Sequence, residues 1–272
     1  MKRKLKSIIA KLHHLGIPLP AGVSRRAENF YKYLKAQEMA RNLFESKALK
    51  YDNAGYWYLD PMPSAEELDH YYATAYWATR DDRKVMLKDR DVAHLNQLLS
   101  THKDLLLSTK EKTVVNFGAG HGGASFLFHA MGFRVINVDP YPGDVDFFEY
   151  RQSLLEIKEE VDVFYASHSL EHLTDIDYTM SQVLQIVKPG GLVFVEVPNA
   201  EHYKYSTANF SGLRRPLIQP PHTVYFTRNY FQGIDLQSIS NETYAYESNR
   251  WGQLDKSGQG EVIRFVGCKL FL

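Results

Sequence analysis

A glycine-rich stretch, KTVVNFGAGHGGASFLF (residues 112–128), constrains the fold of this chain more than any other segment. Its glycines follow a short apolar run directly and precede an apolar segment. Asp139 then ends the next apolar run, VINVDP. Glycines let a backbone approach a ligand because no Cβ intervenes, and an acid at the second strand end is placed to accept hydrogen bonds from ribose hydroxyls. This order predicts a strand, a glycine turn, a helix and a second strand, which form half of a nucleoside-binding unit.

The glycine spacing alone does not identify the nucleoside. Gly118, Gly120 and Gly123 satisfy G-x-G-x-x-G, which is also the fingerprint of dinucleotide sites. Asn116, however, is polar at a position where dinucleotide folds usually carry an apolar residue. Two further segments follow in order, VDVFYASHSLEHLTD (161–175) and IVKPGGLVFVEVPN (186–199). Both observations argue against NAD.

This succession of segments resembles the class I S-adenosylmethionine (SAM) methyltransferases, in particular the group around ubiquinone and sugar methyltransferases. The resemblance is close over about residues 85–200 and looser over 201–272. It implies a Rossmann-like α/β fold with a seven-stranded, mostly parallel sheet, helices on both faces and an antiparallel C-terminal edge. It also implies SAM as cofactor and S-adenosylhomocysteine as product.

Hydrophobic periodicity and turn residues place the individual elements. We expect strands at 113–117, 134–138, near 146–150, at 161–166, at 191–197, near 240–247 and near 261–271. We expect helices at 24–46 with Ser24 as N-cap, 63–77 with a capping box at Ser64, 84–101, 123–131, 175–187 and 227–233. Residues 50–59 are aromatic and strand-like, and about 200–221 is irregular. The chain is thus divided into a helical and aromatic extension (1–83) and a methyltransferase domain (84–272).

The composition indicates which kinds of binding partner and which cellular compartment to expect. The formal net charge is zero, so nothing indicates nucleic acid, and the single cysteine fits a reducing cytoplasm. Residues 2–15 have an amphipathic helical pattern with several lysines. This helix either lies on an anionic membrane surface, at the inner face, or packs on its own domain or a second copy in an oligomer. We favour packing.

The resemblance assigns cofactor contacts residue by residue. It places the methionine portion of SAM at the glycine turn, on Asn116, Phe117, Gly118, Ala119 and Gly120. Asp139, followed by Pro140, would hold the ribose, although an Asp before a proline also caps helices. Gln152 and Ser153 occupy the adenine position, where relatives carry an acid, and His168 would lie beside the transferred methyl group. Tyr76 would face the site from the extension, although simple aromatic packing is favoured residue by residue.

Catalytic candidates follow the fourth strand. Glu171 and His172 form a Glu-His pair there, and histidine is the natural base near neutral pH. The alternative is that the pair only starts the following helix. His222, in PPHTVYFT, is a second candidate base with equal standing. No cluster of carboxylates indicates a metal, so none is expected.

The acceptor is expected to be a small-molecule or lipid-linked glycan. The irregular stretch would form the acceptor wall, with Tyr203, Lys204, Arg214 and Arg215, and two adjacent arginines suit a phosphate or carboxylate. A solvated turn is the alternative. Relatives that methylate sugar carbon often carry a cysteine zinc module, which this chain lacks, so oxygen is favoured. Two other functions stay open: methylation of a quinone or natural product, and a catalytically inactive SAM-fold partner.

Overall fold

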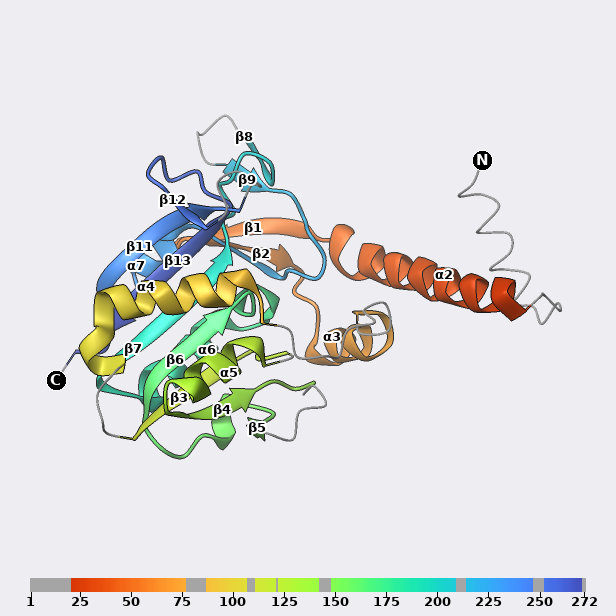
Figure 1. The fold of residues 1–272 in the computed structure, drawn as a ribbon. Helices are drawn as coiled ribbons and strands as arrows, with labels where there is room; N and C mark the ends of the chain where they lie inside the picture. Colours follow the sequence, from red (N-terminus) through yellow and green to blue (C-terminus); the bar gives the residue numbers. More distant parts are fainter. Residues whose placement is uncertain are drawn as a thin grey trace. The chain divides into compact units, whose positions relative to one another are not determined.

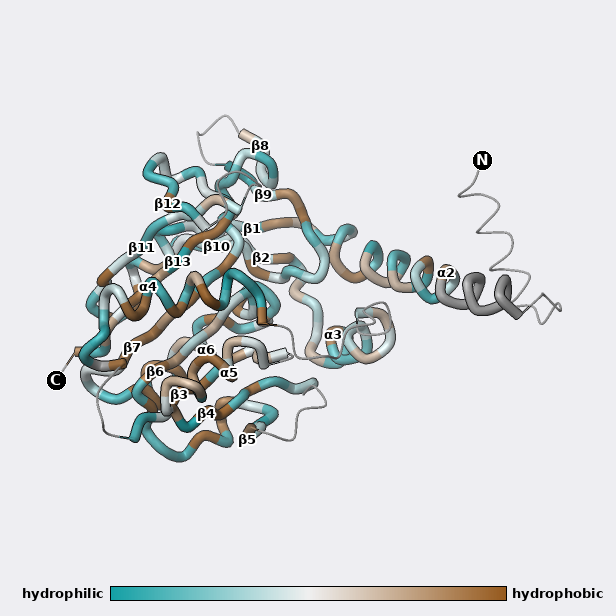
Figure 2. The backbone as a smooth tube through the Cα atoms, in the orientation of Figure 1, coloured by the Kyte–Doolittle hydropathy of each residue, from teal (hydrophilic) through white to brown (hydrophobic). Residues whose placement is uncertain are grey.

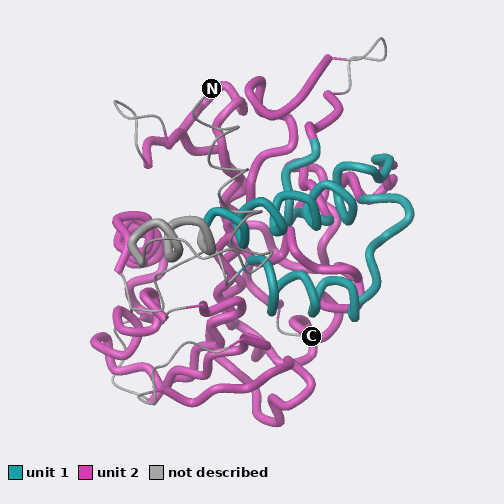
Figure 3. The backbone as a smooth tube through the Cα atoms, turned by 90° about the vertical axis from the view of Figure 1, so that its right-hand side faces the viewer, with its two compact units in different colours: residues 1–49, 59–82, 218–223 teal, residues 50–58, 83–217, 224–272 magenta. Residues whose placement is uncertain are grey.

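The structure is a computed structural model that describes residues 21–76, 87–106, 111–120, 122–141, 148–208, 214–246 and 252–270. The chain forms two compact units (Figure 3). Unit 1 comprises residues 1–49, 59–82 and 218–223, and unit 2 comprises residues 50–58, 83–217 and 224–272. The amphipathic segment 2–15 lies outside the described residues.

Within its described residues, unit 1 contains two helices that each continue into a π-helical turn. Helix α2 (Ala21–Ala40) runs into Arg41–Glu45, and α3 (Ala65–Tyr71) runs into Tyr72–Tyr76. The prediction that Ser24 caps the first helix is wrong, because α2 begins before it. Ser64 does cap α3: its hydroxyl accepts from the Glu67 amide at 3.1 Å, and the Glu67 carboxylate accepts from the Ser64 amide at 2.8 Å.

The main sheet lies in unit 2 and has eight strands within the described residues, in the order β12-β11-β13-β7-β6-β3-β4-β5 (Figure 1). Neighbouring strands from β7 to β5 are parallel, and β13, β11 and β12 add an antiparallel edge. This confirms the Rossmann-like α/β class with an antiparallel C-terminal edge. The strands are β3 (Lys112–Phe117), β4 (Phe133–Val138), β5 (Glu149–Arg151), β6 (Val161–Ser167), β7 (Val187–Pro198), β11 (Gln237–Ala245), β12 (Gln253–Asp255) and β13 (Val262–Cys268). The predicted count of seven omitted β12.

Apolar side chains of alternate strand residues form the core on one face of this sheet, under helices α4 (Asp89–Leu106) and α5 (Gly123–Ala130) (Figure 1). Leu98 and Phe128 from these helices join Val114, Val163 and Phe194 in one buried cluster. Figure 2 shows the hydrophobic colour along the central strands, β7 among them. The intervening strand residues point to the opposite face, as the two-residue strand period requires.

Several segments depart from the predicted elements. The aromatic run 50–59 contains a hairpin, β1 (Ala48–Asp52) and β2 (Tyr56–Asp60), and β2 pairs antiparallel with β10 (Val224–Phe226). The predicted irregular stretch contains the hairpin β8 (Ser206–Ala208) and β9 (Arg214–Pro216). The remaining helices, α6 (Ile176–Ile186) and α7 (Arg228–Gln232), lie within their predicted ranges. Within the part of the chain that the structure describes, no helix is long and apolar enough to cross a membrane.

Candidate active site

A belt of polar side chains lies along the carboxyl edge of the parallel strands, directly above the apolar core. On the face under α4 and α5, β3, β4 and β7 each change from an apolar to a polar residue two positions further on, and antiparallel β13 carries its polar residue two positions before the apolar one. The apolar residues are Val114, Val135, Phe194 and Val266, and the polar residues are Asn116, Asn137, Glu196 and Arg264. All four polar side chains are buried. In α/β sheets this edge is where ligands bind, so the belt marks the candidate site.

The glycine turn leaves β3 at this edge in a left-handed backbone conformation. Gly118 has φ 65° and Gly120 has φ 51°. A Cβ on Gly118 would lie 2.3 Å from the Cβ of Ser169, whereas a Cβ on Gly120 would meet no atom of the described residues within 4 Å. Gly118 is therefore required by the protein's own packing. The space beside Gly120 is the kind of opening that a close-lying ligand fills.

Asp139, at the end of β4, holds this turn. Its carboxylate accepts from the Gly120 amide and from the Tyr141 amide, both at 2.8 Å, and the residue is buried. Asp139 thus ties the end of β4 to the glycine turn, where its ribose role stays a prediction. The neighbouring Pro140 is exposed.

Asn116 belongs to a buried chain of polar side chains beneath the turn. Its amide donates to the Ser125 hydroxyl at 2.8 Å, and that hydroxyl donates to Asn137 at 2.6 Å. This explains in part why a neutral amide stands here: it ties β3 and β4 to the first turn of α5. Phe117 and Ala119 lie half-buried on either side of Gly118, and the Phe117 carbonyl accepts from the Ser169 hydroxyl at 2.9 Å.

The predicted adenine residues follow β5. Ser153 caps the short turn Leu154–Glu156: its hydroxyl accepts from the Leu155 amide, and its own amide donates to Glu156. Gln152 is exposed and its amide also donates to Glu156. The capping role accounts for Ser153, while the Gln152 side chain stays a proposed adenine contact.

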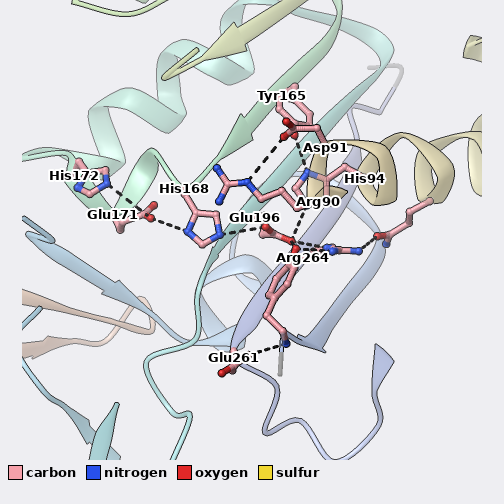
Figure 4. A network of polar contacts seen from close by, with 12 residues as sticks. Arg90, Asp91, His94, Tyr165, His168, Glu171, His172, Glu196, Glu261 and Arg264 are labelled. Atoms are coloured by element: carbon pink, nitrogen blue, oxygen red, sulfur yellow. Dashed lines mark hydrogen bonds and ion pairs between the residues drawn. The ribbon is translucent and has the colours of Figure 1, made fainter. Parts of the chain in front are cut away.

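His168, Glu171 and His172 come together after β6, as Figure 4 shows. The buried Glu171 carboxylate lies 3.4 Å from Nδ1 of His168 and 3.9 Å from Nε2 of His172. Burial by itself lowers the pKa of His168, but the neighbouring carboxylates of Glu171 and Glu196 outweigh it and raise that pKa to about 8. The Glu-His pair is therefore a contact in space as well as in sequence.

Sequence reasoning missed the residues that continue this cluster into the sheet. Glu196 on β7 faces Arg264 on β13, and His94 on α4 contacts the same carboxylate (Figure 4). A signal was present, since VFVEV and VIRFV each carry one charged residue inside an apolar strand. Two such charges are costly to bury unless they pair.

The predicted acceptor residues are on or near the β8–β9 hairpin. Tyr203 and Lys204 are exposed, and the Lys204 ammonium lies 5.7 Å from the centre of the Tyr203 ring. Arg214 braces the hairpin through Ser206, whose hydroxyl it contacts at 2.7 Å, and Arg215 is exposed. Of these four residues, Arg215 and Lys204 carry an exposed charge, and the Lys204 ammonium also lies 3.9 Å from the Glu261 carboxylate.

Two predicted site residues belong to unit 1, and their part in the site stays a prediction. The Tyr76 ring lies 5.0 Å from the Tyr72 ring, edge to face. The His222 amide donates to the Gln219 carbonyl at 2.8 Å.

Comparison with known proteins agrees with this architecture. The family described as "Methyltransferase domain" matches residues 87–243, which is more than half of the chain. Ubiquinone biosynthesis O-methyltransferases of two Rhizobium species, R. etli and R. johnstonii, are 28% identical over 101 residues, covering 32% of this chain and 41% of theirs. This chain thus spans about two fifths of the length of those relatives. The structure of a Burkholderia thailandensis 1,6-didemethyltoxoflavin-N1-methyltransferase, with bound substrate and S-adenosylhomocysteine, shares the fold at a TM-score of 0.52 and 15% identity, covering 82% of this chain and 100% of that one.

Proposed function

This chain belongs to the family of methyltransferase domains, and we propose that it transfers the methyl group of SAM to a hydroxyl of a sugar or glycan in cell-surface polysaccharide synthesis. Methyl transfer itself follows from the family. The observation that carries the proposal is the Glu171 carboxylate between His168 and His172, next to the glycine turn. Oxygen methylation needs a base, and this cluster supplies one.

SAM fits the residues present at the turn. The opening beside Gly120 admits a close-lying ligand, and Asp139 lies directly across from the same glycine. In the proposed arrangement residues 116–120 hold the methionine portion, Asp139 the ribose and Gln152 the adenine. When bound, SAM supplies a methyl group on a sulfonium centre, which is reactive toward an oxygen nucleophile.

His172 is the proposed general base. It is half-buried and near a buried carboxylate, an arrangement that orients an imidazole and stabilises its protonated form. Its role would be to accept the hydroxyl proton of the acceptor as the methyl group arrives. His222 stays the second candidate, and Tyr203, Lys204, Arg214 and Arg215 stay the proposed acceptor wall.

A quinone or other small aromatic molecule is the second candidate acceptor. The Rhizobium ubiquinone O-methyltransferases favour it, because the same oxygen chemistry serves a phenol. The glycan is preferred because exposed Arg215 and Lys204 suit an anionic, sugar-linked phosphate. Placement in the cytoplasm, with or without contact to the inner membrane face, goes with either acceptor.

Incubation with methyl-labelled SAM tests the proposal directly. The full chain is mixed in parallel with cell-envelope glycan extract and with a quinone-precursor extract, and His172→Ala serves as the matched control. Label in the glycan fraction that disappears with His172→Ala supports the proposal. Label confined to the quinone fraction establishes the second candidate. Binding of SAM without transfer to either fraction would identify an inactive partner module and contradict the proposal.

A further inference from the structure

Glu196 lies on β7, and its carboxylate is fully buried. One oxygen, Oε2, accepts from Arg264 Nε at 2.5 Å, from His94 Nε2 at 2.7 Å and from the Tyr246 hydroxyl at 2.8 Å. Burial by itself would raise the pKa of Glu196, but His94 and His168 hold that pKa well below its usual range. The carboxylate is therefore charged and fixed on one side.

His94 contributes to this anchor as a neutral ring. Its Nε2 donates to Glu196, so its Nδ1 accepts from the Tyr165 hydroxyl at 2.7 Å. Complete burial lowers the pKa of His94 despite the nearby carboxylate. Arg264, which also contacts Gln97 and lies over the Tyr244 ring, is thus the full positive charge that balances Oε2.

The other oxygen of Glu196, Oε1, lies 3.2 Å from Nε2 of His168, and Glu171 lies 3.4 Å from Nδ1 of the same ring. A neutral imidazole carries one N–H and would set its bare nitrogen against a carboxylate. Only the doubly protonated ring gives each carboxylate a donor. Of the charged groups facing His168, Glu171 and Glu196 favour this form, and Arg90 on α4 opposes it.

The backbone also fixes His168. It is the one non-glycine residue with a positive φ, 53°, among those the structure describes, and its amide donates to the Glu196 carbonyl at 2.8 Å. A residue with a Cβ adopts this conformation at a cost and keeps it where surrounding contacts demand it. The next residue, Ser169, bonds to the glycine turn through the Phe117 carbonyl.

We propose that Glu196 is a positioning residue that acts through His168: the carboxylates of Glu196 and Glu171 hold the His168 ring as a cation, and this ring holds Glu171 toward His172. Figure 4 shows this line of contacts from Arg264 through Glu196, His168 and Glu171 to His172. His168 is then no base, because both of its ring protons are held by carboxylates. The second half of the proposal, the orientation of His172, rests on the proposed function.

Nitrogen NMR of the full chain, labelled with ¹⁵N-histidine, tests this arrangement. His168 is assigned by the signal lost in His168→Gln, and His172 by His172→Ala. We expect the wild-type His168 ring to be doubly protonated at pH 7 and to titrate near pH 8. A neutral His168 ring at pH 7 would overturn the proposal, and this result needs no variant of Glu196.

Glu196→Gln removes the charge while keeping the shape. We expect the His168 midpoint to fall by about one pH unit or more, because an ion pair at this distance shifts a pKa by that amount, and the His172 signals to change with it. Tyr246→Phe is the matched control, since it removes a contact to Oε2 and leaves Oε1 charged toward His168; the midpoint should stay. An unchanged midpoint in Glu196→Gln contradicts the proposal. If Glu196→Gln fails to fold, Glu171→Gln replaces it: a lowered His168 midpoint supports the proposal, and an unchanged midpoint contradicts it.

These spectra are recorded without acceptor or cofactor. They therefore do not depend on whether the protein methylates a glycan, and the positioning role of Glu196 and the proposed function can be rejected independently.

Discussion

Gly118 and Gly120 show how adjacent residues of one turn have separate roles. Both have positive φ, yet Gly118 is enclosed by Ser169 and Gly120 borders open space. Gly132, which follows α5, has φ 84° and also has nothing near its missing Cβ. A residue with a Cβ would therefore be strained here as at Gly120, at a position outside the glycine turn.

Alanine substitutions separate these roles. Gly118→Ala should lower the free energy of unfolding by about 1–3 kcal/mol through overpacking, in addition to about 1–2 kcal/mol of backbone strain. Gly120→Ala should cost about 1–2 kcal/mol through backbone strain and weaken S-adenosylhomocysteine binding at least about tenfold, which is about 1.4 kcal/mol. Gly132→Ala should show the strain cost with unchanged affinity. Thermal denaturation and calorimetry measure both quantities, and normal affinity in Gly120→Ala would place the ligand elsewhere.

His172, the proposed base, lies 3.9 Å from the buried Glu171 carboxylate. We expect His172→Ala to lower turnover by about 10²–10⁴-fold, the usual cost of losing a general base, with SAM affinity retained. His222→Ala, the comparison variant, should retain more turnover. Rates are measured by label transfer to the accepting extract. The reverse order would make His222 the base.

At the scale of elements, the sequence predicted those features whose interacting residues lie close together along the chain. The glycine turn, Asp139 and the Ser64 capping box were readable because their partners lie within a few residues or one strand-turn-helix unit. The start of β7 was not: the sequence predicts a strand at 191–197, but β7 begins at Val187 with an irregular register against β6, and Gly190 takes φ 79°. A bulge of this kind keeps glycines inside a strand. The Glu196–Arg264 pair was missed because it depends on which strands become neighbours.

The sequence of residues 2–15 leads to a prediction of its own. If this segment lies on a membrane surface, the alternative to the favoured packing, its lysines near an apolar stripe should give weak, salt-sensitive binding to anionic vesicles, at about 1 kcal/mol per basic residue near the surface. Deleting residues 1–17 should abolish sedimentation with such vesicles and leave methylation of a soluble acceptor intact. Unfolding or a changed oligomeric state in the truncated protein would instead show that the stripe packs against protein.

At the scale of the whole molecule, the Glu196 cluster links stability to pH. The pKa of His168 is raised to about 8 from an ordinary value of 6.5. Because the pKa is raised in the folded protein, protonated His168 contributes fully to the free energy of unfolding below about pH 6.5. This contribution is lost as the pH rises through 8. A shift of this size corresponds to at most about 2 kcal/mol.

Denaturant unfolding between pH 6 and pH 9 measures this contribution. The difference in free energy of unfolding between the wild type and His168→Gln should be largest at pH 6 and shrink toward pH 9. Taking this difference cancels the pH-dependent contributions of the titrating groups that the two proteins share. A difference that is constant with pH, or grows as the pH rises, would show that the histidine is not held as a cation.

Calorimetric titration with S-adenosylhomocysteine and, in parallel, with NAD tests the central claim most directly, since both ligands fit a glycine turn followed by an acid. The account predicts micromolar binding of S-adenosylhomocysteine, about −8 kcal/mol, and no competition by NAD. Binding of NAD without binding of S-adenosylhomocysteine would contradict it.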